Sequence, residues 1–215
     1  MNVEDLILVS IDDHVVEPPD MFERHLPAKW REQAPKLITD AAGHQSWEFL
    51  GETVGMMGLN AVAGWPGEEW GMDPSSLAEM RPGSYDVHER IRDMNVNGVL
   101  GTMCFPTFPG FSASHLTRGR NEVAQVMVQA YNDWHLDEFA AAYPGRIHPI
   151  GILPTWDADL MVAEIERLAE RGCHAVAMPE QPHIEDLPSY HDEAFWGPVF
   201  QSLSDNRTVM CLHIG

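Results

Sequence analysis

The 215-residue sequence predicts an α/β protein whose strands form a parallel sheet. Two observations support this fold class. Short apolar runs bounded by Gly, Pro or Asn alternate with longer segments in which apolar residues recur every three or four positions. From residue 98 onward the order is strand, helix, strand, helix, strand, helix, strand, which is typical of βα units.

Five apolar runs are expected to form strands. Each run is short and nearly continuous in apolar residues, as expected of a strand that is covered on both faces. The five runs are 6–9 with Ile11, 98–103, 147–153, 175–178 and 208–212.

Four helical segments are expected between these strands, each with an apolar stripe of helical period. They are 86–95, a segment through Val123, Met127, Ala130 and Trp134, then 160–168, and 195–203 after Asp192. Asp157 or Asp159 is a candidate N-cap for the third helix, and Gly172 suits the position just beyond its end.

The stretch between the first strand and the helix at 86 breaks this alternation. Residues 46–54 predict a small β-excursion, whereas 56–82 is rich in Gly, Trp and Met and has no period. Long loops in compact domains usually have a function. We therefore expect residues 21–85 to be an insertion within one domain spanning 1–215, and 56–82 to form a lid or a subunit contact that includes Trp65 and Trp70.

The net charge indicates which partners are disfavoured, and the cysteine content indicates the redox compartment. Thirteen Lys and Arg against 33 Asp and Glu give a net charge of −20, which repels nucleic acid and anionic membranes. Cys104, Cys173 and Cys211 are far apart and odd in number, which favours a reducing compartment over a disulfide framework. The acidic N-terminus lacks the basic region of a secretory signal, and no apolar run reaches the roughly 18 residues of a membrane helix. We expect a soluble, cytoplasmic protein.

Motifs of several common enzyme classes are absent from the sequence. There is no G-x-S-x-G, H-E-x-x-H, Walker loop or G-x-G-x-x-G. Serine hydrolases, zincins, nucleotide phosphoryl transferases and dinucleotide oxidoreductases are therefore unsupported.

Two strand ends carry residues that suit a metal ion. Asp12 and His14 are two positions apart at the end of the first strand, so their side chains point to the same side while Asp13 points away. His213 ends the fifth strand, where parallel strands present residues to a site at their carboxyl ends. A carboxylate and imidazoles can share a divalent metal ion. In the alternative interpretation, each residue has a structural role without a metal ion. His14 then caps a turn, Asp12 pairs with a nearby basic side chain, and His213 forms a hydrogen bond with a neighbouring loop.

Residues 9–19, Val-Ser-Ile-Asp-Asp-His-Val-Val-Glu-Pro-Pro, resemble the start of the amidohydrolase-related family that includes aminocarboxymuconate-semialdehyde decarboxylase. The segments 131–134, 144–146, 152–154 and 212–215 are similar too. The resemblance implies a metal-dependent TIM-type (β/α)₈ barrel. In that family an H-x-H, D-x-H or E-x-H pair on strand one, a histidine on strand five and an aspartate on strand eight hold the metal. Asp12, His14 and His213 match the first three positions.

The resemblance also implies that this chain supplies about the first five strands of such a barrel, with the insertion after strand one. The late aspartate and the family's second catalytic histidine have no counterpart in it. We expect the remaining strands to come from the rest of the chain or from another subunit, and the protein to be a homo-oligomer.

The expected activity follows from the resemblance. Zn²⁺ is favoured by imidazole and carboxylate ligands, with Mn²⁺ as the alternative. The first expectation is nonoxidative decarboxylation of a small unsaturated or aromatic carboxylate. The second is hydrolysis of a carbonyl substrate by metal-bound hydroxide, and the third a non-catalytic half-barrel partner. No catalytic residue is assigned.

Three further residues are expected to contact substrate. Phe105 follows the second strand, and Glu180 and His183 follow the fourth, on the face that would carry the metal. The alternative for both segments is packing of a Pro-rich rim.

Overall fold

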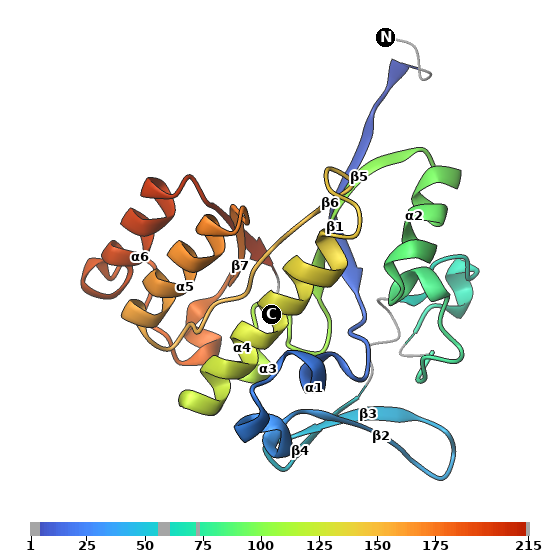
Figure 1. Cartoon of the computed structure of the whole chain (residues 1–215), viewed down its shortest axis with the longest axis horizontal. Coiled ribbons are helices and arrows are strands. Elements are labelled where there is room, and N and C mark those ends of the chain that lie inside the picture. The colour runs from blue at the N-terminus through green and yellow to red at the C-terminus, as the bar shows by residue number, and fades with distance from the viewer. Residues whose placement is uncertain (1–4, 56–60, 72–73, 214–215) are drawn as a thin grey trace. The chain divides into compact units, whose positions relative to one another are not determined.

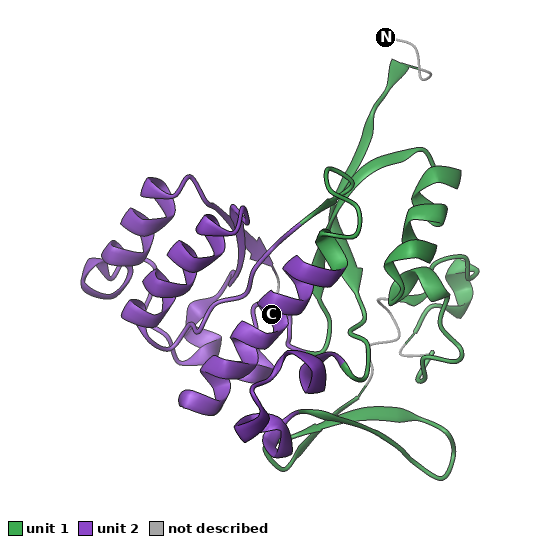
Figure 2. Ribbon diagram, viewed as in Figure 1, with its two compact units in different colours: residues 1–20, 35–108, 139–148 green, residues 21–34, 109–138, 149–215 purple. Residues whose placement is uncertain are grey.

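Residues 5–55, 61–71 and 74–213 are described by the structure, which is a computed structural model. The chain divides into two units, coloured separately in Figure 2. Unit 1 comprises residues 1–20, 35–108 and 139–148, and unit 2 comprises 21–34, 109–138 and 149–215.

Unit 1 contains a three-stranded parallel sheet in the order β1-β5-β6 (Figure 1). Its strands are β1 (Leu8–Val15), β5 (Val99–Pro106) and β6 (Ile147–His148). Helix α2 (Val87–Val96) precedes β5. The carboxylate of Asp86 caps this helix by accepting hydrogen bonds from the backbone N–H groups of His88 and Glu89.

A second, antiparallel sheet in unit 1 confirms the β-excursion expected after strand one. It consists of β2 (Lys36–Thr39), β3 (Gln45–Phe49) and β4 (Glu52–Gly55). Leu50 and Gly51 connect β3 to β4, and both have positive φ, as a two-residue hairpin turn requires. The ring of Trp47 stacks on Phe108 at 4.6 Å between centroids, which joins this sheet to the loop after β5.

The segment expected to form a lid, 56–82, lies partly outside the described residues, which omit 56–60 and 72–73. Its described part includes short 3₁₀ turns at Gly67–Glu69 and, at its end, Pro82–Ser84. The indole N–H of Trp70 donates to the Trp65 carbonyl, and Trp70 is 58% exposed. The lid function stays a prediction.

Unit 2 pairs the parallel strands β7 and β8, and helices pack against one side of this pair. Its strands and α-helices are β7 (Ala175–Pro179), β8 (Val209–His213), α1 (Met21–His25), α3 (Ser114–Thr117), α4 (Glu122–Trp134), α5 (Ala158–Glu170) and α6 (Glu193–Asp205). Asp157 caps α5, and Gly172 follows that helix with φ of 81°, as expected. Leu153, Ile165 and Trp196 belong to the core of this unit.

Shorter helical segments complete the described chain. They are the 3₁₀ helices Ala28–Gln33 and Pro182–Glu185 and the π-helical segment His135–Ala140 that continues α4. Within the described parts, no helix has the length and hydropathy needed to cross a membrane.

Two strand expectations need correction. The strands β1 and β8 are not covered on both faces in the described chain, because Ile11 is 71% and Val209 61% exposed, whereas all of β7 is buried. Each of the two exposed strands has one described neighbour in its sheet. The run 147–153 forms only the two-residue β6 and an isolated bridge from Gly151 to Val176, since Pro149 has no N–H for a ladder.

Candidate metal centre

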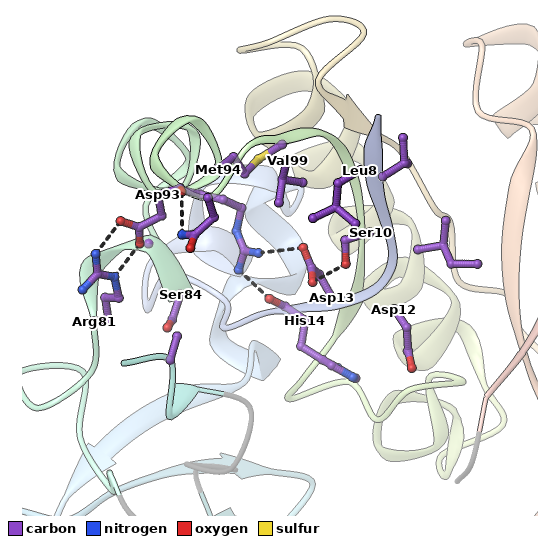
Figure 3. Close-up of a pocket in the computed structure, with 16 residues that line it drawn as sticks. Leu8, Ser10, Asp12, Asp13, His14, Arg81, Ser84, Asp93, Met94 and Val99 are labelled. Atoms are coloured by element: carbon purple, nitrogen blue, oxygen red, sulfur yellow. Dashed lines mark hydrogen bonds and ion pairs between the residues drawn. The ribbon is translucent and has the colours of Figure 1, made fainter. Parts of the chain in front are cut away.

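The carboxyl-terminal half of β1 brings two candidate ligands together. One ligand atom of Asp12 and one of His14 lie within 4.8 Å of each other. Asp12 is exposed and His14 half-buried. Figure 3 shows that Asp13, the residue between them, is turned toward Ser10. The alternation expected along this strand is therefore present.

Asp13 has a structural role in the same strand. Its carboxylate accepts hydrogen bonds from the hydroxyls of Ser10, at 2.6 Å, and Thr102 of β5. The guanidinium of Arg90 lies 3.6 Å from the same carboxylate and also donates to the carbonyl of His14 (Figure 3). Arg90 and Thr102 thus hold the backbone around His14, which leaves Asp12 and His14 as the pair with metal-ligand geometry.

A pocket of about 580 Å³ extends along β1 within unit 1 (Figure 3). Its lining includes residues 8–14 and the ion pair between Arg81 and Asp93, whose Nε and Oδ2 atoms are 2.6 Å apart. The hydrogen bond from Arg81 lowers the pKa of Asp93 below its usual value. This wall of the pocket is therefore polar and ionised at neutral pH.

The donors of Asp12 and His14 fit a divalent metal ion. A carboxylate oxygen and an imidazole nitrogen are ligands that zinc and manganese both accept. The ring of Phe105 lies beside the imidazole of His14, with 6.1 Å between centroids and an interplanar angle of 38°. An aromatic wall thus borders the candidate ligands.

His213 is at the end of β8 in unit 2, as the sequence predicts. Its ring lies 4.4 Å from that of Phe111, and its backbone carbonyl accepts a hydrogen bond from the N–H of Glu180. That His213 shares an ion with Asp12 and His14 stays a prediction.

The three expected substrate contacts differ in exposure. Phe105 is 4% exposed at the end of β5, next to His14. Glu180 and His183 are exposed in unit 2, after β7. Their contact with substrate also stays a prediction.

Glu17 has a role that no sequence motif predicts. It is fully buried, and its two carboxylate oxygens accept the backbone N–H groups of Thr107 and Phe108, each at 2.9 Å. Burial raises the pKa of Glu17 to about 7, although the backbone N–H donors lower it. A lone carboxylate between two valines and two prolines was the available signal in the sequence.

Comparison with known proteins gives a family match over most of the chain. A family model described as amidohydrolase matches residues 24–215. A search of curated proteins finds no significant match.

Solved structures share the fold at low sequence identity. An amidohydrolase from Mycobacterium avium subsp. paratuberculosis K-10 matches with a TM-score of 0.68 and 20% identity, covering 98% of this chain and 59% of its own. A dihydroxybenzoic acid decarboxylase from Polaromonas sp. JS666, with bound manganese and the inhibitor 2-nitroresorcinol, has a TM-score of 0.57 and 18% identity over 97% of this chain and 49% of its own.

A third match is 2,6-dihydroxybenzoate decarboxylase from Rhizobium, with a TM-score of 0.56 and 16% identity over 96% of this chain and 49% of its own. The chain therefore spans between about half and three-fifths of the length of these structures. At these identities the likeness shows a common α/β fold.

Proposed function

This chain belongs to the amidohydrolase family, and on that basis we propose that it contributes to a metal-dependent enzyme in which Asp12, His14 and His213 hold one divalent ion. The observation that carries the proposal is the pairing of Asp12 and His14, whose ligand atoms lie within 4.8 Å at the end of one strand. His213 ends another parallel strand, β8, and offers an imidazole nitrogen, as His14 does.

The proposed architecture is a TIM-type barrel to which this chain supplies about five strands. Parallel pairing within each unit supports it, as does the fold shared with the amidohydrolase from Mycobacterium avium. In such a barrel the carboxyl ends of all strands face one site. Further strands would come from the rest of the protein or from another subunit.

The proposed reaction is nonoxidative decarboxylation of a small unsaturated or aromatic carboxylate. The Polaromonas and Rhizobium structures support this choice, because both are dihydroxybenzoate decarboxylases. When bound, a divalent ion supplies positive charge that stabilises negative charge on a substrate oxygen. In the reaction the carboxyl group leaves as CO₂, and the carbon that keeps the electron pair takes up a proton.

The protein residues would orient the substrate. The buried ring of Phe105 lies next to His14, and we propose that it borders the substrate site there. Glu180 and His183 are exposed and polar, so each can bond to a hydroxyl or carboxylate of the substrate.

Hydrolysis of a carbonyl substrate is the second candidate. It is favoured by the Mycobacterium avium structure, which is described as an amidohydrolase and has a higher TM-score than the two decarboxylases. The two reactions differ in their products, so one assay separates them.

The first experiment measures metal in the protein purified as its gene encodes it. We expect about one zinc or manganese per chain, and Asp12→Ala or His14→Ala to lower metal affinity by at least about 100-fold, since each removes a direct ligand. His191→Ala is the matched control, because His191 is exposed and distant in sequence from the three ligands. Equal metal content in His14→Ala and His191→Ala would contradict the assignment.

The second experiment assays the metal-loaded protein with 2,6-dihydroxybenzoate, measuring CO₂ release, and with ester and amide substrates, measuring the free acid. CO₂ release supports decarboxylation, and acid release supports hydrolysis. Metal binding without turnover across such panels would favour a non-catalytic half-barrel partner.

A further inference from the structure

The ladder between β1 and β5 ends close to the candidate metal centre. Its last pairs are His14 with Phe105 and Val15 with Pro106. Pro106 has no N–H, so it cannot donate to the partner strand. The two backbone N–H groups that follow, those of Thr107 and Phe108, belong to residues that are 4% and 2% exposed. Buried N–H groups need acceptors, and the ladder does not provide them.

Glu17 provides both acceptors from a position 90 residues away in the sequence. Its Oε1 accepts from Thr107 and its Oε2 from Phe108, each at 2.9 Å. Only a carboxylate offers two acceptor oxygens at this position, since a glutamine would turn an NH₂ donor toward one of the two N–H groups. The side chain of Glu17 therefore extends the attachment of β1 to β5 by two residues.

Further contacts tie this attachment to the candidate ligands. Phe108 stacks on Trp47, which is 1% exposed, so the loop after β5 is also held from the β2-β3-β4 sheet. On the other side of Pro106, the ring of Phe105 lies 6.1 Å from that of His14. A shift of the loop at 107–108 would thus displace Phe105 relative to His14.

We propose that Glu17 is a positioning residue of the candidate metal centre: its carboxylate fixes the end of β5 and thereby the Phe105 ring beside the His14 imidazole. The inference rests on the proposed function only where it names this region a metal centre. The backbone donors favour the ionised form of the carboxyl, which predominates at pH 8 given its pKa of about 7.

The test uses Glu17→Gln in the protein as its gene encodes it, at pH 8 and without added metal. Hydrogen exchange of the 105–110 segment reports the attachment of β1 to β5. We expect at least one of the Thr107 and Phe108 amides to exchange about tenfold faster or more, because one buried donor loses its acceptor. The NMR chemical shifts of a labelled His14 imidazole report the position of the Phe105 ring, because the ring current of Phe105 shifts them. We expect those signals to move.

Glu164→Gln is the matched control. Glu164 is also a buried carboxylate, 3% exposed, but it accepts from Asn132 in unit 2. We expect this variant to lose thermal stability while the exchange at 105–110 and the His14 signals stay as in the wild type. Glu17→Asp, which keeps two oxygens but shortens their reach, replaces Glu17→Gln if the latter does not fold, and should shift both readouts in the same direction.

The proposal would be overturned if the His14 signals were unchanged in the Glu17 variants, or if they changed equally in Glu164→Gln. Glu17 would then only accept hydrogen bonds from two buried backbone amides. Because both readouts are made without metal, they are independent of the proposed function. A wild-type protein that binds no metal but shows the Glu17 effects would contradict the proposed function alone.

Discussion

At the scale of single residues, two neighbouring carboxylates and one buried carboxylate have different tasks. Asp12 is exposed beside His14, Asp13 is bonded to Ser10 and Thr102, and Glu17 is buried against backbone donors. All three side chains carry the same chemical group, a carboxylate. The surroundings therefore decide which carboxylate we propose as a metal ligand, which stabilises the strand, and which holds a loop.

The buried carboxyl of Glu17 predicts a pH-dependent stability. Its pKa is raised from 4.5 to about 7, so between these values the folded protein holds a proton that the unfolded chain has released. Raising the pH through this window therefore destabilises the fold, by about 3 kcal/mol once the carboxyl is ionised in both states.

Urea unfolding of the wild type and of Glu17→Gln at pH 5, 6, 7 and 8 measures this contribution. We expect the free energy of unfolding of the wild type to fall relative to that of Glu17→Gln by about 3 kcal/mol across the window. Curves that run parallel from pH 5 to 8 would show that Glu17 has an ordinary pKa in the folded protein.

At the scale of elements, Asn132 joins three segments of unit 2. Its side-chain Nδ2 donates to the backbone carbonyl of Ile152 at 2.9 Å and to the carboxylate of Glu164 at 2.6 Å. Its side-chain Oδ1 accepts the backbone N–H of Ile152 at 2.9 Å. Glu164 in turn pairs with Arg167. Helices α4 and α5 and the segment before Pro154 are thus held together by one fully buried side chain. The segment 131–134, which contributed to the family resemblance, has this structural task.

Replacing Asn132 with Ala should destabilise the protein by about 2–4 kcal/mol, because it leaves buried backbone and carboxylate groups without these partners. Gln129→Ala is the control on the same helix. Its contact with Glu164 is 3.5 Å long, so we expect a change within about 0.5 kcal/mol. Thermal or urea unfolding of the two variants measures the difference, and equal losses would contradict the role of Asn132.

At the scale of the whole molecule, apolar side chains on two strands lack cover within the described residues. Ile7, just before β1, is 74% exposed, and Ile11 within β1 is 71% exposed. Val209 and Leu212 of β8 are 61% and 51% exposed. Exposed apolar strands tend to pair with other chains. This agrees with the proposal that further strands of a barrel cover them.

Residues 1–215 produced alone should therefore self-associate at micromolar concentration, as size-exclusion chromatography with light scattering would show. The variant carrying Ile7→Lys and Ile11→Lys should associate less, because charges on an edge strand oppose pairing. If residues 1–215 alone are soluble, monomeric and as active as the protein purified as its gene encodes it, the barrel proposal is wrong.

The sequence by itself determined the features that depend on neighbours in the chain. Apolar periodicity located the four longer helices, α2, α4, α5 and α6, and most strands, but not the short helices α1 and α3. Asp157 and Gly172 marked the ends of α5, and the alternation along β1 separated Asp12 and His14 from Asp13. These features depend on local backbone geometry, which repeats every two or 3.6 residues. A pattern of a few residues is therefore enough to predict them.

The tertiary structure alone decided the burial of Glu17, the three bonds of Asn132 and the exposure of β1 and β8. Each depends on residues distant in the sequence: Thr107 lies 90 positions from Glu17, and Ile152 lies 20 positions from Asn132. The free energy of a buried polar group depends on whether a partner reaches it, and that is settled only when distant segments pack together.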